Sequence, residues 1–243
     1  MACRESSPLR SDLTHTEMRR LIAAIPREPR HLSFLVDAET TAAAFCQTLL
    51  GEEAGNTPCT PQRATELGQT VLQLLERLFF VIGEESGKHK NINALALSVG
   101  LWIAKRQGEI REIGLVVNGL AMTANGARDR RELEALYEIS LHIVHAADPF
   151  LKADLNKHER HRPWRLLCLN HCIIATRTGD GELAKASYDF LVAHLPEEAG
   201  EFFEMGMRKV AGGQYSAHCR KIMRAYYETH ADSARRNPSA VMH

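Results

Sequence analysis

The sequence lacks a long apolar run: no stretch of its 243 residues approaches the roughly 18 consecutive apolar residues that a membrane span requires. The first twenty residues carry charges where a secretory signal peptide needs an apolar core. An excess of either charge is also missing, because 30 basic and 30 acidic residues cancel. Since no overall field then attracts nucleic acid or anionic lipid, we expect a cytoplasmic protein that binds no membrane, and nucleic acid could bind only through a local patch such as the basic cluster at 157–165.

Familiar catalytic signatures are missing too. The six cysteines include no C-x-x-C pair, so we expect reduced thiols rather than a disulfide framework. The Gly-x-Gly at 179–181 has neither the preceding strand nor the third glycine of a phosphate-binding loop. No Ser-centred nucleophile elbow occurs either. These absences argue against the enzyme classes that carry such motifs, and nothing in them requires a cofactor.

Helical periodicity dominates what is present. Apolar residues make up 44% and charged residues 25% of the chain, a balance typical of folded domains. Strand-type alternation is absent, whereas apolar residues recur at three- and four-residue steps almost everywhere after residue 60. The pattern predicts a nearly all-α fold, with a helix content well above the ordinary one third.

The sequence contains two clear helix-capping signals. Thr60 followed by Pro61 is a capping residue with a proline at the tolerated first helical position. The helix after it should bury a stripe made of Leu67, Val71, Leu74, Leu78 and Ile82. Asp129 with Glu132 forms a capping box. The core face of the helix after that box is predicted at Leu133, Leu136, Ser140, Val144 and Ala147.

Evenly spaced turn signals divide the later part of the chain. They fall at Gln107-Gly108, Asn125-Gly126, Asp148-Pro149, Arg162-Pro163, Gly179-Asp180, Pro196 and Gly212-Gly213. Taking alternate signals gives four helical hairpins of about 35 residues, at 90–125, 127–161, 163–196 and 197–231. A fixed period of this length is typical of helix-turn-helix arrays.

The part before the hairpins is less regular, because prolines interrupt it. We expect an N-terminal helical arm or cap over residues 1–60, with short helices near 12–25 and 38–50. Residues 61–89 are predicted to be a long helix and a polar loop, the loop covering ESGKHKN at 85–91. Residues 232–243 are expected to be a disordered tail.

The stretch from Gly179 to Pro196 resembles the second helix of a tetratricopeptide repeat. The turn, small, aromatic and closing positions are matched by Gly179-Asp180, Ala184, Tyr188 and Pro196. The next unit is similar, with Phe202, Gly206, Gly213-Gln214-Tyr215 and Ala225 at the corresponding positions. The resemblance covers about residues 165–231. It implies a right-handed array of antiparallel hairpins, an α-solenoid, whose groove binds a protein or peptide segment, and it implies no catalysis.

One side of a predicted helix carries four potential metal ligands: Glu134, Glu138, His142 and His145. Carboxylates and imidazoles are ligands for transition metals such as iron, manganese or zinc. If the 127–161 hairpin turns near Asp148-Pro149, His158 comes opposite Glu138 and completes the site, with His161 as the alternative. An ordinary solvated helix face gives the same pattern, so the stripe supports only an alternative function, an all-helical metal-dependent oxidase or hydrolase.

A second cluster, KHERHRPWR at 157–165, surrounds an indole with basic side chains: Arg160, Arg162, Trp164 and Arg165. Guanidinium groups beside an indole can hold a phosphate or an acidic peptide. A basic helix end with Trp164 buried between hairpins is the other interpretation. Three residues farther along, Cys168, His171 and Cys172 share a helix face that could hold zinc or could simply contribute buried thiols to the core.

The function that these patterns favour is protein–protein interaction through a helical groove, with self-association left open. The repeat phasing also makes a local prediction. Phe202, Gly206 and Val210 follow at four-residue spacing, which places Gly206 on a buried face at a close helix–helix contact. The partner helix is expected to present Cys219 and Ile222 there.

Overall fold

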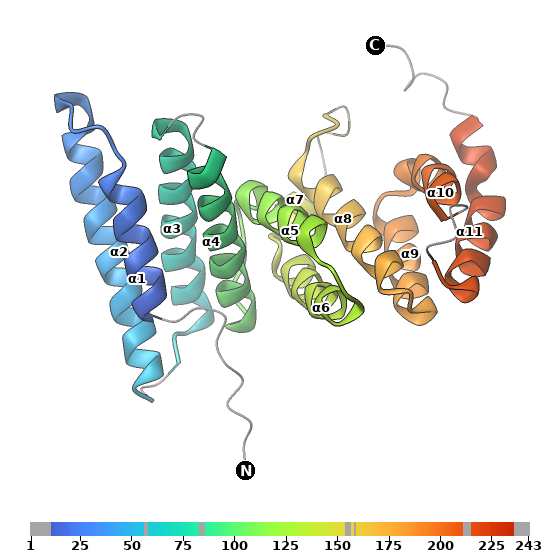
Figure 1. Ribbon diagram of the computed structural model, residues 1–243, viewed down its shortest axis with the longest axis horizontal. Coiled ribbons are helices and arrows are strands. Elements are labelled where there is room, and N and C mark those ends of the chain that lie inside the picture. The colour runs from blue at the N-terminus through green and yellow to red at the C-terminus, as the bar shows by residue number, and fades with distance from the viewer. Residues whose placement is uncertain are drawn as a thin grey trace. The chain divides into compact units, whose positions relative to one another are not determined.

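The computed structural model describes residues 11–55, 58–82, 86–153, 157, 159–210 and 215–235. In these ranges the elements are α1 (Ser11–Ala23), η1 (Pro29–His31), α2 (Leu32–Glu53), α3 (Pro61–Val81), α4 (Ser86–Lys105), α5 (Gly114–Gly126), α6 (Arg130–Ala146), α7 (Pro149–Lys152), α8 (Pro163–Thr178), α9 (Gly181–His194), α10 (Pro196–Val210) and α11 (Ala217–Arg235) (Figure 1). No strand occurs among the described residues, which confirms the all-α fold. None of the described helices has both the length and the apolar character needed to cross a membrane.

The described residues group into two compact units. The first contains the chain up to Asn125 together with His142–Ala153, and the second contains Gly126–Leu141 together with the described residues from 157 onward. Helix α6 therefore contributes its first part to the second unit and its last part to the first.

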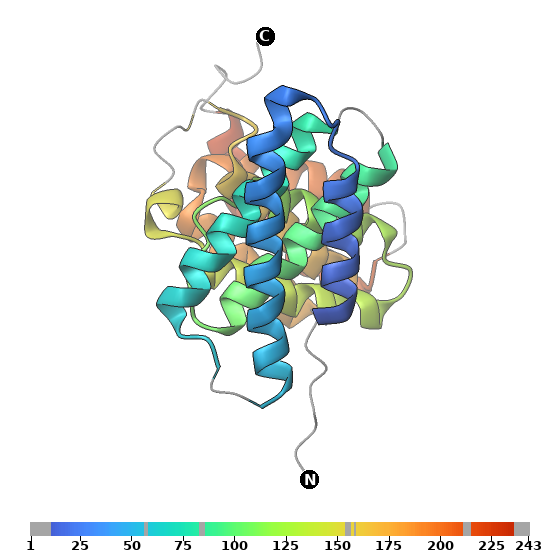
Figure 2. The same ribbon diagram turned by 90° about the vertical axis from the view of Figure 1, so that its left-hand side faces the viewer.

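The core of the first unit is made by α1 to α4. Helix α2 packs against α1 and α3, while α4 packs against α3 and α1. In Figure 2 α1 and α2 lie side by side in front of α3 and α4. An open stack of hairpins would keep the first and fourth helices apart, so the α1–α4 contact is a feature of a closed four-helix bundle.

Helix α5 crosses α4 at a very close approach. A β-carbon placed on Gly119 of α5 would lie 2.2 Å from the backbone oxygen of Asn93 and 2.9 Å from Cβ of Leu97. Only glycine lets the two backbones come this near. The last part of α6 is then held by the 110–111 segment, because the Ile110 amide donates to the Ala146 oxygen at 2.8 Å.

The second unit is built from α8 to α11 with the first part of α6. Helix α9 packs against α8, α10 and α11, and α10 packs against α11. The turn between α8 and α9 needs glycine, because Gly179 has φ of 73° at the helix end. This pairing of neighbouring helices is compatible with a helical repeat array.

The local helix signals are confirmed. The Thr60 hydroxyl accepts from the Arg63 amide at 3.3 Å, and Pro61 begins α3. The Glu132 amide donates to the Asp129 carboxylate at 2.8 Å just before α6. The predicted core residues of both helices are buried, except Ile82, which is half-buried. Of the predicted turns, Gly212-Gly213 lies outside the described residues.

One sequence prediction in this part of the chain is wrong. The polar loop at 85–91 is helical from Ser86 onward, because its polar residues form the first turns of α4. The two helices of the predicted 90–125 hairpin, α4 and α5, contact each other at Gly119, and α4 also packs against α3. In the 127–161 hairpin, α6 is followed only by the four-residue helix α7 among the described residues. Helix α11 also continues to Arg235, past the predicted hairpin end at 231.

Gly206 lies at a helix–helix contact, with Phe202 and Val210 buried on the same face. The predicted neighbours were wrong, however. A β-carbon on Gly206 would meet the side chain of Met223, at 2.6 Å from Cε. Cys219 and Ile222 face the α8–α9 turn instead, where Ile222 approaches Gly181 and the Cys219 thiol lies 3.8 Å from the Thr176 oxygen.

Candidate functional site

The first hairpin, α1 with α2, is held at both of its ends. At the open end, Ser11 donates its amide to Glu53 Oε1 at 2.8 Å and its hydroxyl to Oε2 at 2.5 Å. At the closed end, the His31 ring nitrogen Nδ1 lies 3.0 Å from the Pro26 oxygen. Between the ends, Met18 of α1 and Phe45 of α2 are almost fully buried. The inner faces of both helices are thus fixed, and their outer faces are left without a further helix of this unit over them (Figure 2).

A groove of about 380 Å³ runs between the outer faces of α1 and α2. We call it the α1–α2 groove. It is lined by His15, Arg19, Ile22, Ala23, Arg27, Leu35, Glu39, Ala42 and Ala43. Because α1 residues at spacings of four and three share one side of the helix, His15, Arg19 and Ile22 form one continuous wall. The three alanines keep the groove open, since they carry no larger side chain to fill it.

The α1–α2 groove carries an uncompensated positive charge. Arg19 and Arg27 are exposed, and within the described parts of the chain neither guanidinium has an ion pair with a carboxylate. Their sequence neighbours behave differently: Arg20 pairs with Glu17 at 3.9 Å, and Arg30 pairs with Glu28 at 2.7 Å. Glu39 is the one acidic residue in the groove lining. The groove can therefore attract a carboxylate or phosphate.

Apolar side chains continue the α2 wall of the groove outward. Leu32, Val36 and Leu50 have exposed fractions of 56%, 64% and 54%, and Ala43 is exposed as well. Their spacing places these four residues along one stripe of α2, distinct from the buried face that holds Phe34, Ala38 and Phe45. We call this set the α2 stripe. Single exposed apolar residues are normal on a protein surface, but an aligned set beside a groove is typical of a binding surface.

Sequence reasoning missed the α1–α2 groove and the α2 stripe. A signal was present, because α2 is apolar over more of its circumference than one core face requires. The charged residues gave no such signal. In the sequence Arg19 and Arg27 resemble ordinary surface arginines, because the positions of neighbouring carboxylates are known only from the structure.

Two arginines of the predicted binding cluster at 157–165 make contacts within the second unit. Arg162 is 5% exposed and donates to the Lys157 and Glu159 oxygens at 3.0 and 3.1 Å. Its other terminal nitrogen lies 3.2 Å from Glu198 of α10. Arg165 reaches the same carboxylate at 2.6 Å. Of the four residues predicted to bind a partner, only Arg160 is exposed.

The charge of Glu198 is stabilised by these contacts. Burial alone would raise the pKa of Glu198, but the hydrogen bond and charge of Arg165, with the charge of Arg162, outweigh it and lower the pKa. Glu198 and its neighbour Glu197 also lie in the first turn of α10, where the helix dipole favours negative charge. Both arginines are therefore used to dock the start of α8 against the start of α10.

Trp164, the aromatic centre of the predicted cluster, is a core residue. It is 2% exposed and packs edge-on against Phe190 and His194, with ring centroids 6.1 and 6.2 Å away. Its indole nitrogen is buried and has no hydrogen-bond partner among the described residues. This is the arrangement of the second interpretation, in which the indole is buried between helices.

The predicted metal ligands Glu138, His142 and His145 are exposed on α6. Two of them, His142 and His145, line a hollow of about 440 Å³ with Glu109, Gln107 and Lys152. Across the described part of the chain, no three His, Cys, Asp or Glu side chains lie together as a metal site would need. The fourth predicted ligand, His158, lies outside the described residues.

His171 is buried in a hydrogen-bonded cluster. Its Nδ1 lies 2.8 Å from the Ser140 hydroxyl and its Nε2 lies 3.1 Å from the Ser187 hydroxyl. Because Ser140 already donates to the Tyr137 oxygen at 2.7 Å, it accepts from Nδ1, and Ser187 donates to Nε2. Both ring nitrogens are thus used, and the neighbouring Cys168 and Cys172 thiols are fully buried. Burial raises the pKa of Cys172 well above its ordinary value, as expected for a core thiol.

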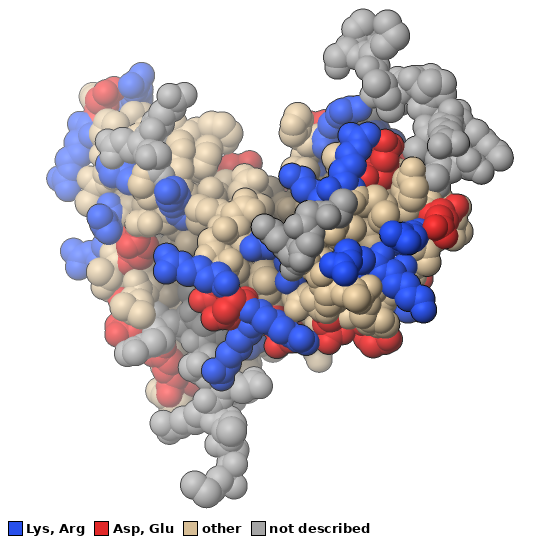
Figure 3. Space-filling model, turned by 45° about the vertical axis from the view of Figure 1, so that its right-hand side comes forward, with Lys and Arg blue, Asp and Glu red and all other residues tan. Residues whose placement is uncertain are grey.

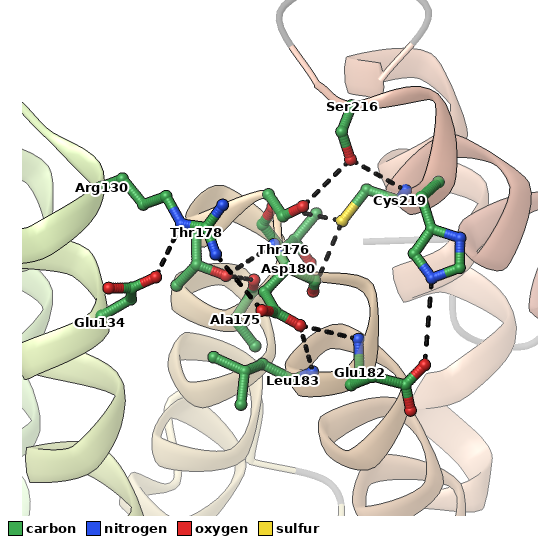
Figure 4. A network of polar contacts seen from close by, with 12 residues as sticks. Arg130, Glu134, Ala175, Thr176, Thr178, Asp180, Glu182, Leu183, Ser216 and Cys219 are labelled. Atoms are coloured by element: carbon green, nitrogen blue, oxygen red, sulfur yellow. Dashed lines mark hydrogen bonds and ion pairs between the residues drawn. The ribbon is translucent and has the colours of Figure 1, made fainter.

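A second polar network joins α6, α8, α9 and α11 around Asp180 (Figure 4). The Asp180 carboxylate caps α9 by accepting from the Glu182 and Leu183 amides, at 2.9 and 3.2 Å. Its second oxygen lies 3.3 Å from Arg130, which also pairs with Glu134 at 2.7 Å. Ser216 donates to the Gly179 oxygen at 3.0 Å. The network fixes the α8–α9 turn. Glu134, one of the four potential metal ligands on this helix, belongs to the network through its ion pair with Arg130.

The face drawn in Figure 3 has basic and acidic side chains interspersed, as the zero net charge suggests. Comparisons with family models, with curated proteins and with solved structures found no match to this chain. The site therefore has to be interpreted from its own geometry.

Proposed function

We propose that this protein is a protein-binding module and that its binding surface is formed by the α1–α2 groove with the α2 stripe. One observation carries the proposal: Leu32, Val36 and Leu50 are each more than half exposed, in line on α2, the helix that forms one wall of the groove. Full burial of such a side chain contributes about 1.5–3 kcal/mol. A fold that leaves three of them aligned on one helix gives up that stabilisation unless a partner covers them.

The geometry supports recognition of a segment rather than of a small molecule. The walls of the groove are formed by α1 and α2, and most of its lining residues are exposed, so a ligand there keeps contact with solvent. Small-molecule sites enclose most of their ligand. Helix pairs with an apolar edge are a common docking surface for a segment of another protein.

The experiment compares the chain with a double variant, Leu32→Asp with Val36→Asp. Immobilised wild-type protein and variant are incubated with the same native extract, and the captured proteins are quantified by mass spectrometry. We expect a set of proteins to be captured by the wild type and lost with the double variant. Phe150→Asp on α7 is the matched control, because Phe150 is 77% exposed but lies away from the groove.

Both variants should unfold at nearly the wild-type midpoint, because exposed substitutions away from special contacts usually change stability by about 0.5 kcal/mol or less. Unchanged capture by the double variant, or equal loss with Phe150→Asp, would contradict the proposal.

A further inference from the structure

The walls of the α1–α2 groove differ in charge. On the α1 side stand His15, Arg19 and Arg27, and on the α2 side stand Leu35 and Glu39. Neither arginine has a carboxylate partner among the described residues, so this side keeps its full positive charge. An occupant that fits both walls carries acidic groups along one edge and at most one basic group along the other.

The length and lining of the groove also constrain its occupant. From His15 to Ala23 the α1 wall is nine residues long, and its eight helical steps correspond to about 12 Å. Three of the lining residues, Ala23, Ala42 and Ala43, are small and allow another backbone to approach closely. Both walls are α helices whose backbone groups are already bonded within the helix, so they offer no edge to which an extended strand could add.

Apolar contacts must accompany the charges. Leu32 and Val36 continue the α2 wall at the end of the groove near Arg27, because α1 and α2 are antiparallel and joined at that end. Apolar residues at helical spacing on the partner can therefore cover the α2 stripe while its acidic edge faces α1. A lipid surface is a poorer fit, because the site is hollowed and contains Glu39.

We propose that the partner segment is an acidic amphipathic α helix of at least about two turns that lies in the α1–α2 groove with its carboxylates against Arg19 and Arg27. This inference rests on the proposed function, because it names the chemistry of the segment that the same surface binds. The apolar face of the partner supplies most of the affinity, and the charges set its orientation and its preference for one partner over another.

The test uses two labelled synthetic peptides of about 16 residues that differ only in charge. Both have leucines along one helical face, and their flanking edge is glutamate in one peptide and lysine in the other. Binding to the full chain is followed by fluorescence anisotropy. We expect the glutamate peptide to bind at least about tenfold tighter than the lysine peptide, and its binding to weaken as salt is raised from about 0.05 to 0.3 M.

The decisive variant is Arg19→Glu with Arg27→Glu. It should reverse the preference so that the lysine peptide binds the tighter of the two. The matched control is Arg20→Glu with Arg30→Glu, which alters neighbouring arginines that do not line the groove and should leave the preference unchanged. Equal affinity for both peptides, or a preference that the Arg19 and Arg27 substitutions do not reverse, would overturn the inference.

Other occupants give distinct results. If a second copy fills the groove, light scattering will show a dimer that the Leu32→Asp and Val36→Asp variant dissociates, and the inference fails. If anionic vesicles of phosphatidylserine bind the chain through Arg19 and Arg27 while the glutamate peptide does not, it fails as well. Loss of captured proteins with the Leu32→Asp and Val36→Asp variant, without binding of the glutamate peptide, leaves the proposed function standing and overturns only the acidic-helix inference.

Discussion

Two groups of arginines in this molecule have opposite surroundings. Arg162 and Arg165 stand in a dense basic cluster, yet they are largely buried and pair with Glu198. Arg19 and Arg27 stand in an unremarkable stretch, yet they are exposed on a groove and lack a carboxylate partner among the described residues. The density of charge in a sequence is therefore a poor guide to a binding surface, because the carboxylates that neutralise it can come from a distant helix.

The largest expected effect concerns Trp164, which the sequence suggested as a binding residue. Trp164→Ala removes a buried indole, so we expect the free energy of unfolding to fall by about 3–5 kcal/mol. Chemical denaturation followed by circular dichroism measures it. Phe150→Ala is the control, since it removes an aromatic ring that is 77% exposed and should change stability by about 0.5 kcal/mol or less. If Trp164→Ala leaves the free energy of unfolding nearly unchanged, Trp164 does not act as a core residue.

The next effect concerns the partner of the buried arginines. Glu198→Ala leaves Arg162 and Arg165 without their shared carboxylate, so we expect a loss of about 2–3 kcal/mol. Glu201→Ala on the same helix is the matched control, because Glu201 is exposed and should change stability little. The same denaturation assay distinguishes the two. If both substitutions cost the same, the buried ion pairs do not hold the start of α8 to α10.

The pH dependence of stability is a further test of the contribution of Glu198. The folded pKa of Glu198 is lowered, so its contribution is fully present above the unfolded value of about 4.3 and is lost as the pH falls through the folded pKa. The difference in the free energy of unfolding between the wild type and Glu198→Gln should therefore shrink as the pH falls below about 4.3. Urea denaturation of both proteins from about pH 6 to pH 3 measures the difference, and a gap that stays constant over this range would contradict the assignment.

The elements that the sequence predicted correctly have local causes. Thr60 with Pro61 and Asp129 with Glu132 mark helix starts by contacts within four residues, and the structure contains both contacts. The loop predicted at 85–91 was wrong because its polar residues are fixed by distant partners. His89 stacks on Phe79 with centroids 3.9 Å apart, and Asn91 donates to Glu17 at 2.7 Å across 74 residues of sequence.

The candidate site could not be predicted for the same reason. Whether Arg162 is a binding residue depends on Glu198, which lies 36 residues away. Whether Leu32 and Val36 are exposed depends on which helices cover α2, and the helix pattern alone does not determine that. The buried Cys168 and His171 were recognised as one of two interpretations, but the serine partners of His171 come from α6 and α9.

The smallest expected effect concerns the exposed arginines, Arg19 and Arg27. Arg19→Gln with Arg27→Gln removes two charges that have no carboxylate partner among the described residues, so we expect a change in stability of about 0.5 kcal/mol or less. Thermal unfolding followed by circular dichroism is sufficient to measure it. A marked loss of stability would mean that these arginines serve the fold, as Arg162 does.

The exposed and the buried arginines can be compared directly by chemical modification. Phenylglyoxal reacts with arginine side chains in the native protein, and peptide mass spectrometry measures the rate at each residue. Arg19 and Arg27 are exposed, whereas Arg162 is 5% exposed and the Arg165 side chain is 15% exposed. We expect rapid modification of Arg19 and Arg27 and slow modification of Arg162 and Arg165, with the difference lost in urea. Equal rates at all four residues in the native protein would contradict this expectation.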